Sequence, residues 1–190
     1  RLDGPKNALE AITAKAKDKT LCIDGGGWRG AGGNRGRDGG SVSIIGGIIG
    51  GVVVTGGKGG SSNAADEVNI TVMVPPGTNV TLDDVSGDAE IGDIGGDLDV
   101  TFKGTGRVHC GSVRSASISI SGVGDVRVGE VTGSLNARIS GSGNIRVKSG
   151  TVTALDAKIS GSGNFSFDGV TDTATLTISG VGNINVGKVK

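Results

Sequence analysis

Acidic side chains are the densest chemical feature of this sequence. Seven carboxylates lie between positions 83 and 99 with no basic residue among them: Asp83, Asp84, Asp88, Glu90, Asp93, Asp97 and Asp99. Carboxylate oxygens are the ligands that calcium prefers, and Asp93, Asp97 and Asp99 are the candidates for such a site. However, the spacing matches neither the twelve-residue calcium loop nor the nine-residue calcium repeat. We therefore expect a solvated acidic face and no cofactor, with calcium as the alternative.

The residues capable of nucleophilic chemistry are few. The only histidine, His109, precedes Cys110, and adjacent strand residues point to opposite faces, so the two do not form a nucleophile-base pair. Export to an oxidising compartment would allow Cys22 and Cys110 to form a disulfide, with a free buried cysteine as the alternative. Since the chain has no tyrosine either, we predict that it is not an enzyme.

A second group of chemically active residues lies in a glycine-rich stretch. Positions 25–40 contain nine glycines, which predicts a loop, and its large or basic side chains are Trp28, Arg29, Arg35 and Arg37. Trp28 is suited to stacking on a sugar or inserting into a partner. The three arginines are suited to meeting the acidic face of a neighbouring copy. We expect these four residues to mediate interactions.

Composition limits the fold and the partners. Glycine occurs 39 times in 190 residues and aromatic residues make up 2%, so the core must be thin and built from Ile, Val, Leu and Ala. The formal net charge is zero, which argues against a nucleic-acid partner. No apolar run approaches the length of a transmembrane segment, and the start at Arg1 fits an exported and processed product, or equally a chain shortened before expression.

A repeat positions most of the remaining residues. Four near copies of Ile-Ser-Gly-x-Gly-Asn/Asp carry their serines at 121, 140, 160 and 179, a period of 19 or 20 residues. This period is the scale of one solenoid coil. Apolar residues alternate with polar ones between glycine corners, which indicates strands. The sequence therefore predicts an all-β parallel β-helix.

Stacking the coils places equivalent residues in columns. One apolar ladder contains Ile120, Ile139, Ile159 and Ile178. A polar ladder follows the corner glycines at Asp125, Asn144, Asn164 and Asn183. Stacked Asn side chains hydrogen-bond along the coil axis and tolerate corner conformations, so we interpret this ladder as structural, with ligand binding as the alternative.

The chain divides unevenly within one solenoid domain over 1–190. We predict two opening strands with a turn at 17–19 in residues 1–24, although Ala8–Lys17 also suits a helix. A glycine-rich insert covers 25–60, and its part from 41 to 60 alternates β-branched residues with Gly-Gly, which suits strands in a core wall or in a subunit contact. Regular rungs are expected over 68–190.

These motifs resemble the head GIN domain family of autotransporter adhesins. The resemblance rests on the Gly-Ser-Gly-Asn-Ile and Gly-Val-Gly-Asn-Ile corners, on Val68–Leu82 followed by Val85–Asp88, and on Gly4–Asn7 with Leu9–Ile12 and Lys17–Leu21. It implies a right-handed β-helix exported to the periplasm or cell surface, and it supplies no catalytic residues. The insert at 25–60 departs from the family pattern.

The functional expectation follows from the last repeat. The sequence reaches Lys190 directly after a full repeat with no visible polar cap, so we expect either a neighbouring copy or a removed C-terminal segment to cover this end. We favour a structural or adhesive subunit that assembles end to end into a filament. The alternatives are an envelope module, monomeric or compactly oligomeric, that binds surface glycans or another surface partner, and a polysaccharide-cleaving β-helix enzyme.

Overall fold

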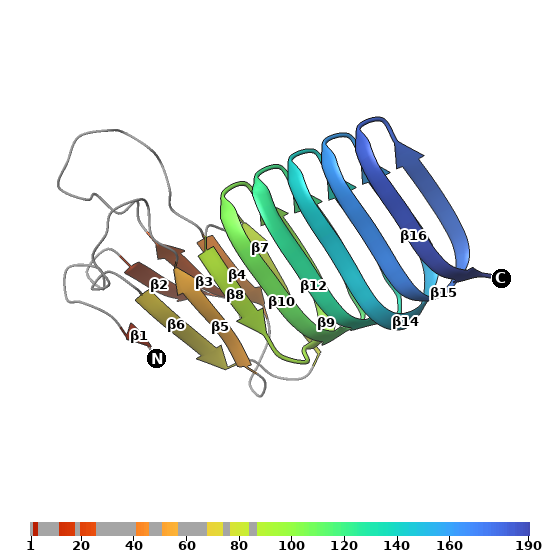
Figure 1. Ribbon diagram of the computed structural model, residues 1–190. Helices are drawn as coiled ribbons and strands as arrows, with labels where there is room; N and C mark the ends of the chain where they lie inside the picture. Colours follow the sequence, from red (N-terminus) through yellow and green to blue (C-terminus); the bar gives the residue numbers. More distant parts are fainter. Residues whose placement is uncertain are drawn as a thin grey trace.

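Strands make up all the regular structure that is described. The computed structural model describes the backbone of residues 2–3, 12–17, 20–25, 41–45, 51–56, 68–73, 77–83 and 87–190. Sixteen strands in these ranges belong to one continuous sheet that winds around a common axis (Figure 1). The predicted all-β parallel solenoid is confirmed.

Two faces alternate along the coils, and we call them face A and face B. Face A contains β8 (Gly87–Ile91), β10 (Thr105–Val113), β12 (Val123–Val131), the first part of β14 (Ser142–Ile159), the first part of β15 (Ser162–Ile178) and β16 (Val181–Val189). Face B contains β7 (Thr78–Asp83), β9 (Gly95–Phe102), β11 (Ser115–Ile120), β13 (Ser134–Ile139) and the second parts of β14 and β15. Each strand pairs in parallel with its equivalent one coil away, for example Val123 with Ser142 and Ser142 with Ser162.

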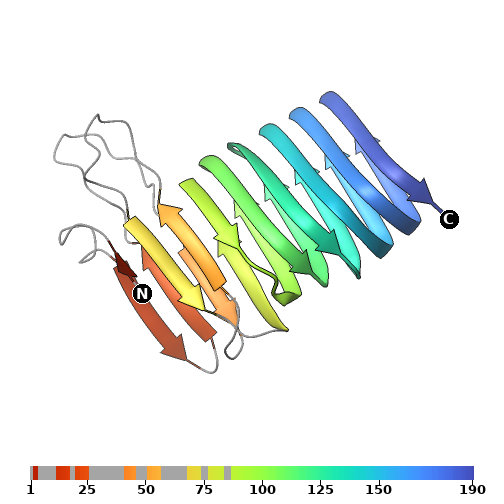
Figure 2. The same ribbon diagram turned by 60° about the horizontal axis from the view of Figure 1, so that its bottom comes forward.

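The N-terminal strands extend both faces with the opposite pairing. On face A, β5 (Gly51–Gly56) lies antiparallel to β8, and β6 (Val68–Met73) and β1 (Leu2–Asp3) follow it. On face B, β4 (Ser41–Ile45) lies antiparallel to β7, and β3 (Thr20–Gly25) and β2 (Ile12–Lys17) follow it. Figure 2 shows these strands continuing the coils towards the N-terminus.

The structure corrects one predicted boundary and supports two predicted elements. Val68–Met73 is not a regular rung, because β5 lies between β6 and β8 and pairs with both in the antiparallel sense. Parallel coils begin at Thr78 instead. The predicted opening hairpin is present as β2 and β3, and the strand alternative holds over the described residues 12–17. The predicted strands within 41–60 are β4 and β5.

The apolar ladder forms the centre of the core. Ile120 is in register with Ile139, Ile139 with Ile159, and Ile159 with Ile178. The first three are almost completely buried, and a second buried column contains Val126, Ile145 and Phe165. Full burial of such a side chain contributes roughly 1.5–3 kcal/mol. Each coil therefore gains stability from the coil beside it.

The last coil differs from the coils before it in the burial of its side chains. Ile178 is 48% exposed although its register partner Ile159 is 0% exposed. Leu176 is 46% exposed, whereas its register partner Ala157 is buried. These two side chains occupy inward positions of face B at the C-terminal end of the solenoid.

Glycine at the corners allows neighbouring coils to approach each other closely. A Cβ atom at Gly163 would overlap the carbonyl oxygen of Gly143, and a Cβ atom at Gly143 would overlap that of Gly124. Because strands in a sheet lie about 4.8 Å apart, only a residue without a side chain fits at these stacked positions. The Gly-x-Gly part of the repeat is thus a packing requirement.

We predict that Gly163→Ala lowers the free energy of unfolding by about 2–3 kcal/mol, because the new methyl group forces two coils apart. Gly129→Ala is the matched control, since a Cβ atom there would lie 3.2 Å from the carbonyl oxygen of Gly111 and needs only a small adjustment. Urea denaturation measures both values. Equal losses for the two variants would contradict the close-approach explanation.

Candidate functional site

The polar ladder on face A is a continuous chain of hydrogen bonds. Asn144 donates from its backbone N–H and from Nδ2 to Oδ1 of Asp125, at 3.2 and 2.8 Å. Asn164 donates in the same way to Asn144 at 3.2 and 3.0 Å, and Asn183 to Asn164 at 3.2 and 3.1 Å. The structural role that we interpreted for these four residues is consistent with this geometry.

Position 107 interrupts the ladder. The backbone N–H of Arg107 donates to Oδ1 of Asp88 at 2.9 Å, so its amide is satisfied as the others are. Arg107 is in register with Asp125, but a guanidinium has no acceptor atom to offer to the next coil. The ladder that runs through Asp125, Asn144, Asn164 and Asn183 therefore starts at Asp125.

A groove lies beside this ladder on face A. Its volume is about 270 Å³, and it is lined by Asp125, Val126, Arg127, Asn144, Ile145, Arg146, Asn164 and Ser166. The polar members come from two columns: the ladder itself, and the column two residues further along each strand. Because alternate strand residues share a face, both columns point away from the core.

The two arginines in the groove differ in their partners. Arg146 Nη2 lies 3.3 Å from Asp168 Oδ2, and both side chains are about half exposed. Arg127 has no ion pair among the residues whose side chains are described. The sequence analysis did not single out Arg127 and Arg146, although each of these arginines follows a ladder residue by two positions in consecutive repeats.

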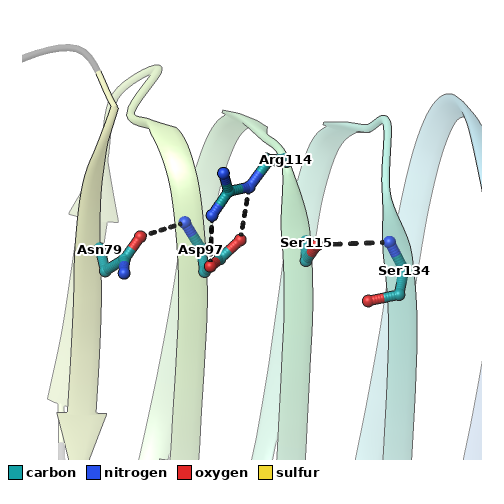
Figure 3. A network of polar contacts seen from close by, with 5 residues as sticks. All are labelled: Asn79, Asp97, Arg114, Ser115 and Ser134. Atoms are coloured by element: carbon teal, nitrogen blue, oxygen red, sulfur yellow. Dashed lines mark hydrogen bonds and ion pairs between the residues drawn. The ribbon is translucent and has the colours of Figure 1, made fainter.

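A second polar network lies on face B, where strands begin (Figure 3). Asn79 Oδ1 accepts a hydrogen bond from the backbone N–H of Asp97 at 2.9 Å, and Ser115 Oγ accepts one from Ser134 at 3.3 Å. Arg114 donates to both carboxylate oxygens of Asp97, at 2.9 and 2.6 Å. The hydrogen bonds from Arg114 lower the pKa of Asp97 below its ordinary value.

The calcium candidates are not brought together. Arg114 engages both oxygens of Asp97, Asp93 accepts a hydrogen bond from the backbone of Ser112 at 2.6 Å, and Asp99 is exposed on β9. Within residues 77–83 and 88–190, no three metal-ligating side chains cluster. Residues 83–99 contain no basic residue, but the next coil supplies Arg114 as a partner for Asp97.

Cys110 is a free, fully buried thiol, which is the alternative to a disulfide with Cys22. Burial raises the pKa of the Cys110 thiol from 9.0 to about 12, so the thiol stays protonated and unreactive at neutral pH. On face B, Cys22 is in register with Ser43, Ser43 with Thr81, and Thr81 with the exposed Asp99. Cys110 lies on face A, in register with the buried Ile91. The two cysteines therefore belong to different faces.

His109 is exposed, as the alternation predicts.

The remaining predicted contact residues lie outside the described part of the chain. These are Trp28, Arg29, Arg35 and Arg37. Among the residues that are described, no helix is long and apolar enough to cross a membrane.

Comparison with known proteins identifies one family. The family model described as "Putative auto-transporter adhesin, head GIN domain" matches residues 1–190. No curated protein and no solved structure matches the chain.

We predict that Asn164→Ala lowers the free energy of unfolding by about 2 kcal/mol, since it removes one donor and leaves two donors of Asn183 without their acceptor. Asn183→Ala removes a single side-chain donor and should cost about 1 kcal/mol or less. Urea denaturation of both variants gives the comparison. If the two costs are the same, the ladder does not act as a connected chain.

Proposed function

Because the chain belongs to the head GIN domain family of auto-transporter adhesins, we propose that it is a non-catalytic adhesive module, exported to the cell surface or periplasm, that associates with copies of itself through its C-terminal coil. The family and the solenoid fold make it an extracellular adhesin-type module. Self-association is the finer part of the proposal.

The burial of the C-terminal coil supports self-association. Leu176 and Ile178 occupy positions that are buried in every preceding described coil, yet nearly half of each side chain is exposed. The outer edges of β15 and β16 carry backbone groups suited to pairing with a further strand.

The occupant that we propose is a second copy of this chain. Each coil of the regular region stacks on a coil of nearly the same sequence, with Gly163 over Gly143 and Asn164 over Asn144. The last coil repeats this pattern at Gly182 and Asn183. Its edge is therefore complementary to the chemistry that the chain itself carries.

The geometry of association decides the assembly. Contact between the C-terminal coil and the N-terminal strands β1 and β2 of another copy is heterologous and extends into a filament, as we expect from the sequence. Contact between two C-terminal coils is isologous and closes as a pair. Both bury Leu176 and Ile178, and electron microscopy distinguishes a fibre from a pair.

The test changes one inward side chain on the last coil. We predict that Leu176→Lys abolishes the concentration-dependent association of the 190-residue chain in sedimentation velocity, because burying a lysine without a partner is strongly unfavourable. Thr177→Lys is the matched control, since Thr177 is exposed and points to the outer side of the same strand.

The proposal expects Thr177→Lys to associate as the unmodified chain does. It would be overturned if the unmodified chain stays monomeric up to the highest soluble concentration, or if both lysine variants weaken association equally.

A further inference from the structure

We propose that the groove on face A binds a linear polysaccharide that carries carboxylate groups. This inference concerns a ligand and a site, and it does not depend on self-association through the C-terminal coil. It rests on the groove of about 270 Å³, on its polar lining and on its repetition along the solenoid axis.

The lining is suited to the hydroxyl groups of sugars. Asn144 and Asn164 each use one Nδ2 hydrogen for the ladder, so a second amide hydrogen on each is free to donate. Oδ1 of Asp125 already accepts two hydrogen bonds, which leaves Oδ2 to accept from a hydroxyl group. On the third coil, the hydroxyl group of Ser166 donates to Oδ1 of Asp168 at 3.2 Å, so it offers a sugar an acceptor.

The repetition of the lining favours a linear polymer over a single sugar. Equivalent positions follow one another at the strand spacing of about 4.8 Å, one per coil, through Asp125, Asn144 and Asn164. A polymer that lies along the solenoid axis meets the carboxylate acceptor of Asp125 on one coil and an amide donor on each of the following coils. Asn183 continues the column by one more coil.

The arginines favour a ligand that carries carboxylates. Arg127 and Arg146 are in register on adjacent coils, and a guanidinium binds a carboxylate through two parallel hydrogen bonds. Arg107 and His109 add basic groups on the preceding coil. The acids nearby are Asp88 and Asp125, which flank Arg107 in the ladder column, Glu90 next to His109 in the other column, and Asp168, which pairs with Arg146.

Aromatic stacking, the other common means of holding a sugar ring, is not offered by this part of the chain. The aromatic residues within 77–83 and 88–190 are Phe102, Phe165 and Phe167, and all three are buried in the core. Charge and hydrogen bonding must therefore supply the affinity for a glycan on this face.

The experiment compares two forms of one polymer. We expect isothermal titration calorimetry to detect binding of polygalacturonate and no binding of the fully methyl-esterified polymer, in which the same sugars lack free carboxylates. The double variant Arg127→Gln/Arg146→Gln should bind polygalacturonate at least roughly tenfold more weakly, and added salt should weaken binding to the unmodified chain.

The matched control changes two stacked basic residues on face B. Arg138 and Lys158 are exposed and in register, so Arg138→Gln/Lys158→Gln removes the same charge away from the groove. This variant should retain the affinity of the unmodified chain, and thermal unfolding should show that both double variants fold.

The inference would be overturned by equal binding of the esterified polymer, by equal loss of affinity in the control variant, or by unchanged affinity of Arg127→Gln/Arg146→Gln. The Leu176→Lys variant separates this inference from the proposed function, because it should lose self-association and keep polygalacturonate binding. Loss of binding in that variant would also contradict the site on face A.

Discussion

Direct stacking of one coil on the next is the constraint on which the rest of this structure depends. The backbones of neighbouring coils must lie at the strand spacing along the whole coil, including the corners. Glycine is required at corner positions 143 and 163 because a Cβ atom there would overlap a carbonyl oxygen of the preceding coil. The same stacking places Ile139 directly over its equivalents on both sides. A thin core of aliphatic side chains is thus stabilised only when several coils are present.

The corners pose a separate problem, because a turning chain leaves backbone N–H groups without an acceptor on the coil before. Side chains provide that acceptor in this protein. Asp125 does so for Asn144 on face A, and Asn79 does so for Asp97 on face B. Each such hydrogen bond contributes on the order of 1 kcal/mol, so these short polar residues are part of the architecture. They also determine which polar groups the solenoid presents to its surroundings.

The combination of the two constraints explains why function is carried on the outward columns. Most inward positions are filled by Val, Ile, Leu, Phe and Ala, and most corner positions by Gly, Ser, Asn and Asp. The strand positions that face solvent are free of both demands. Arg127 and Arg146 occupy such positions, and the exposed Arg114 lies at the bend between β10 and β11. Variation at these sites changes surface chemistry at little cost to the fold.

Much of the fold was predictable because the repeat is local in sequence. The period between Ser121, Ser140 and Ser160 gives the coil length, and alternation around Ile139 gives the inward face. The ion pair of Arg114 with Asp97 was not predictable in the same way, because it joins coils whose register was unknown there. The antiparallel pairing of Val68–Met73 was missed for a related reason: strand alternation is the same in both pairing senses.

The register of the coils is tested most directly by nuclear Overhauser effects between isoleucine methyl groups in the methyl-labelled chain. We predict contacts from Ile120 to Ile139, from Ile139 to Ile159 and from Ile159 to Ile178, in that order, with no contact between Ile139 and Ile178. Contacts that connect these residues in another order, or no contact between Ile139 and Ile159, would contradict this prediction.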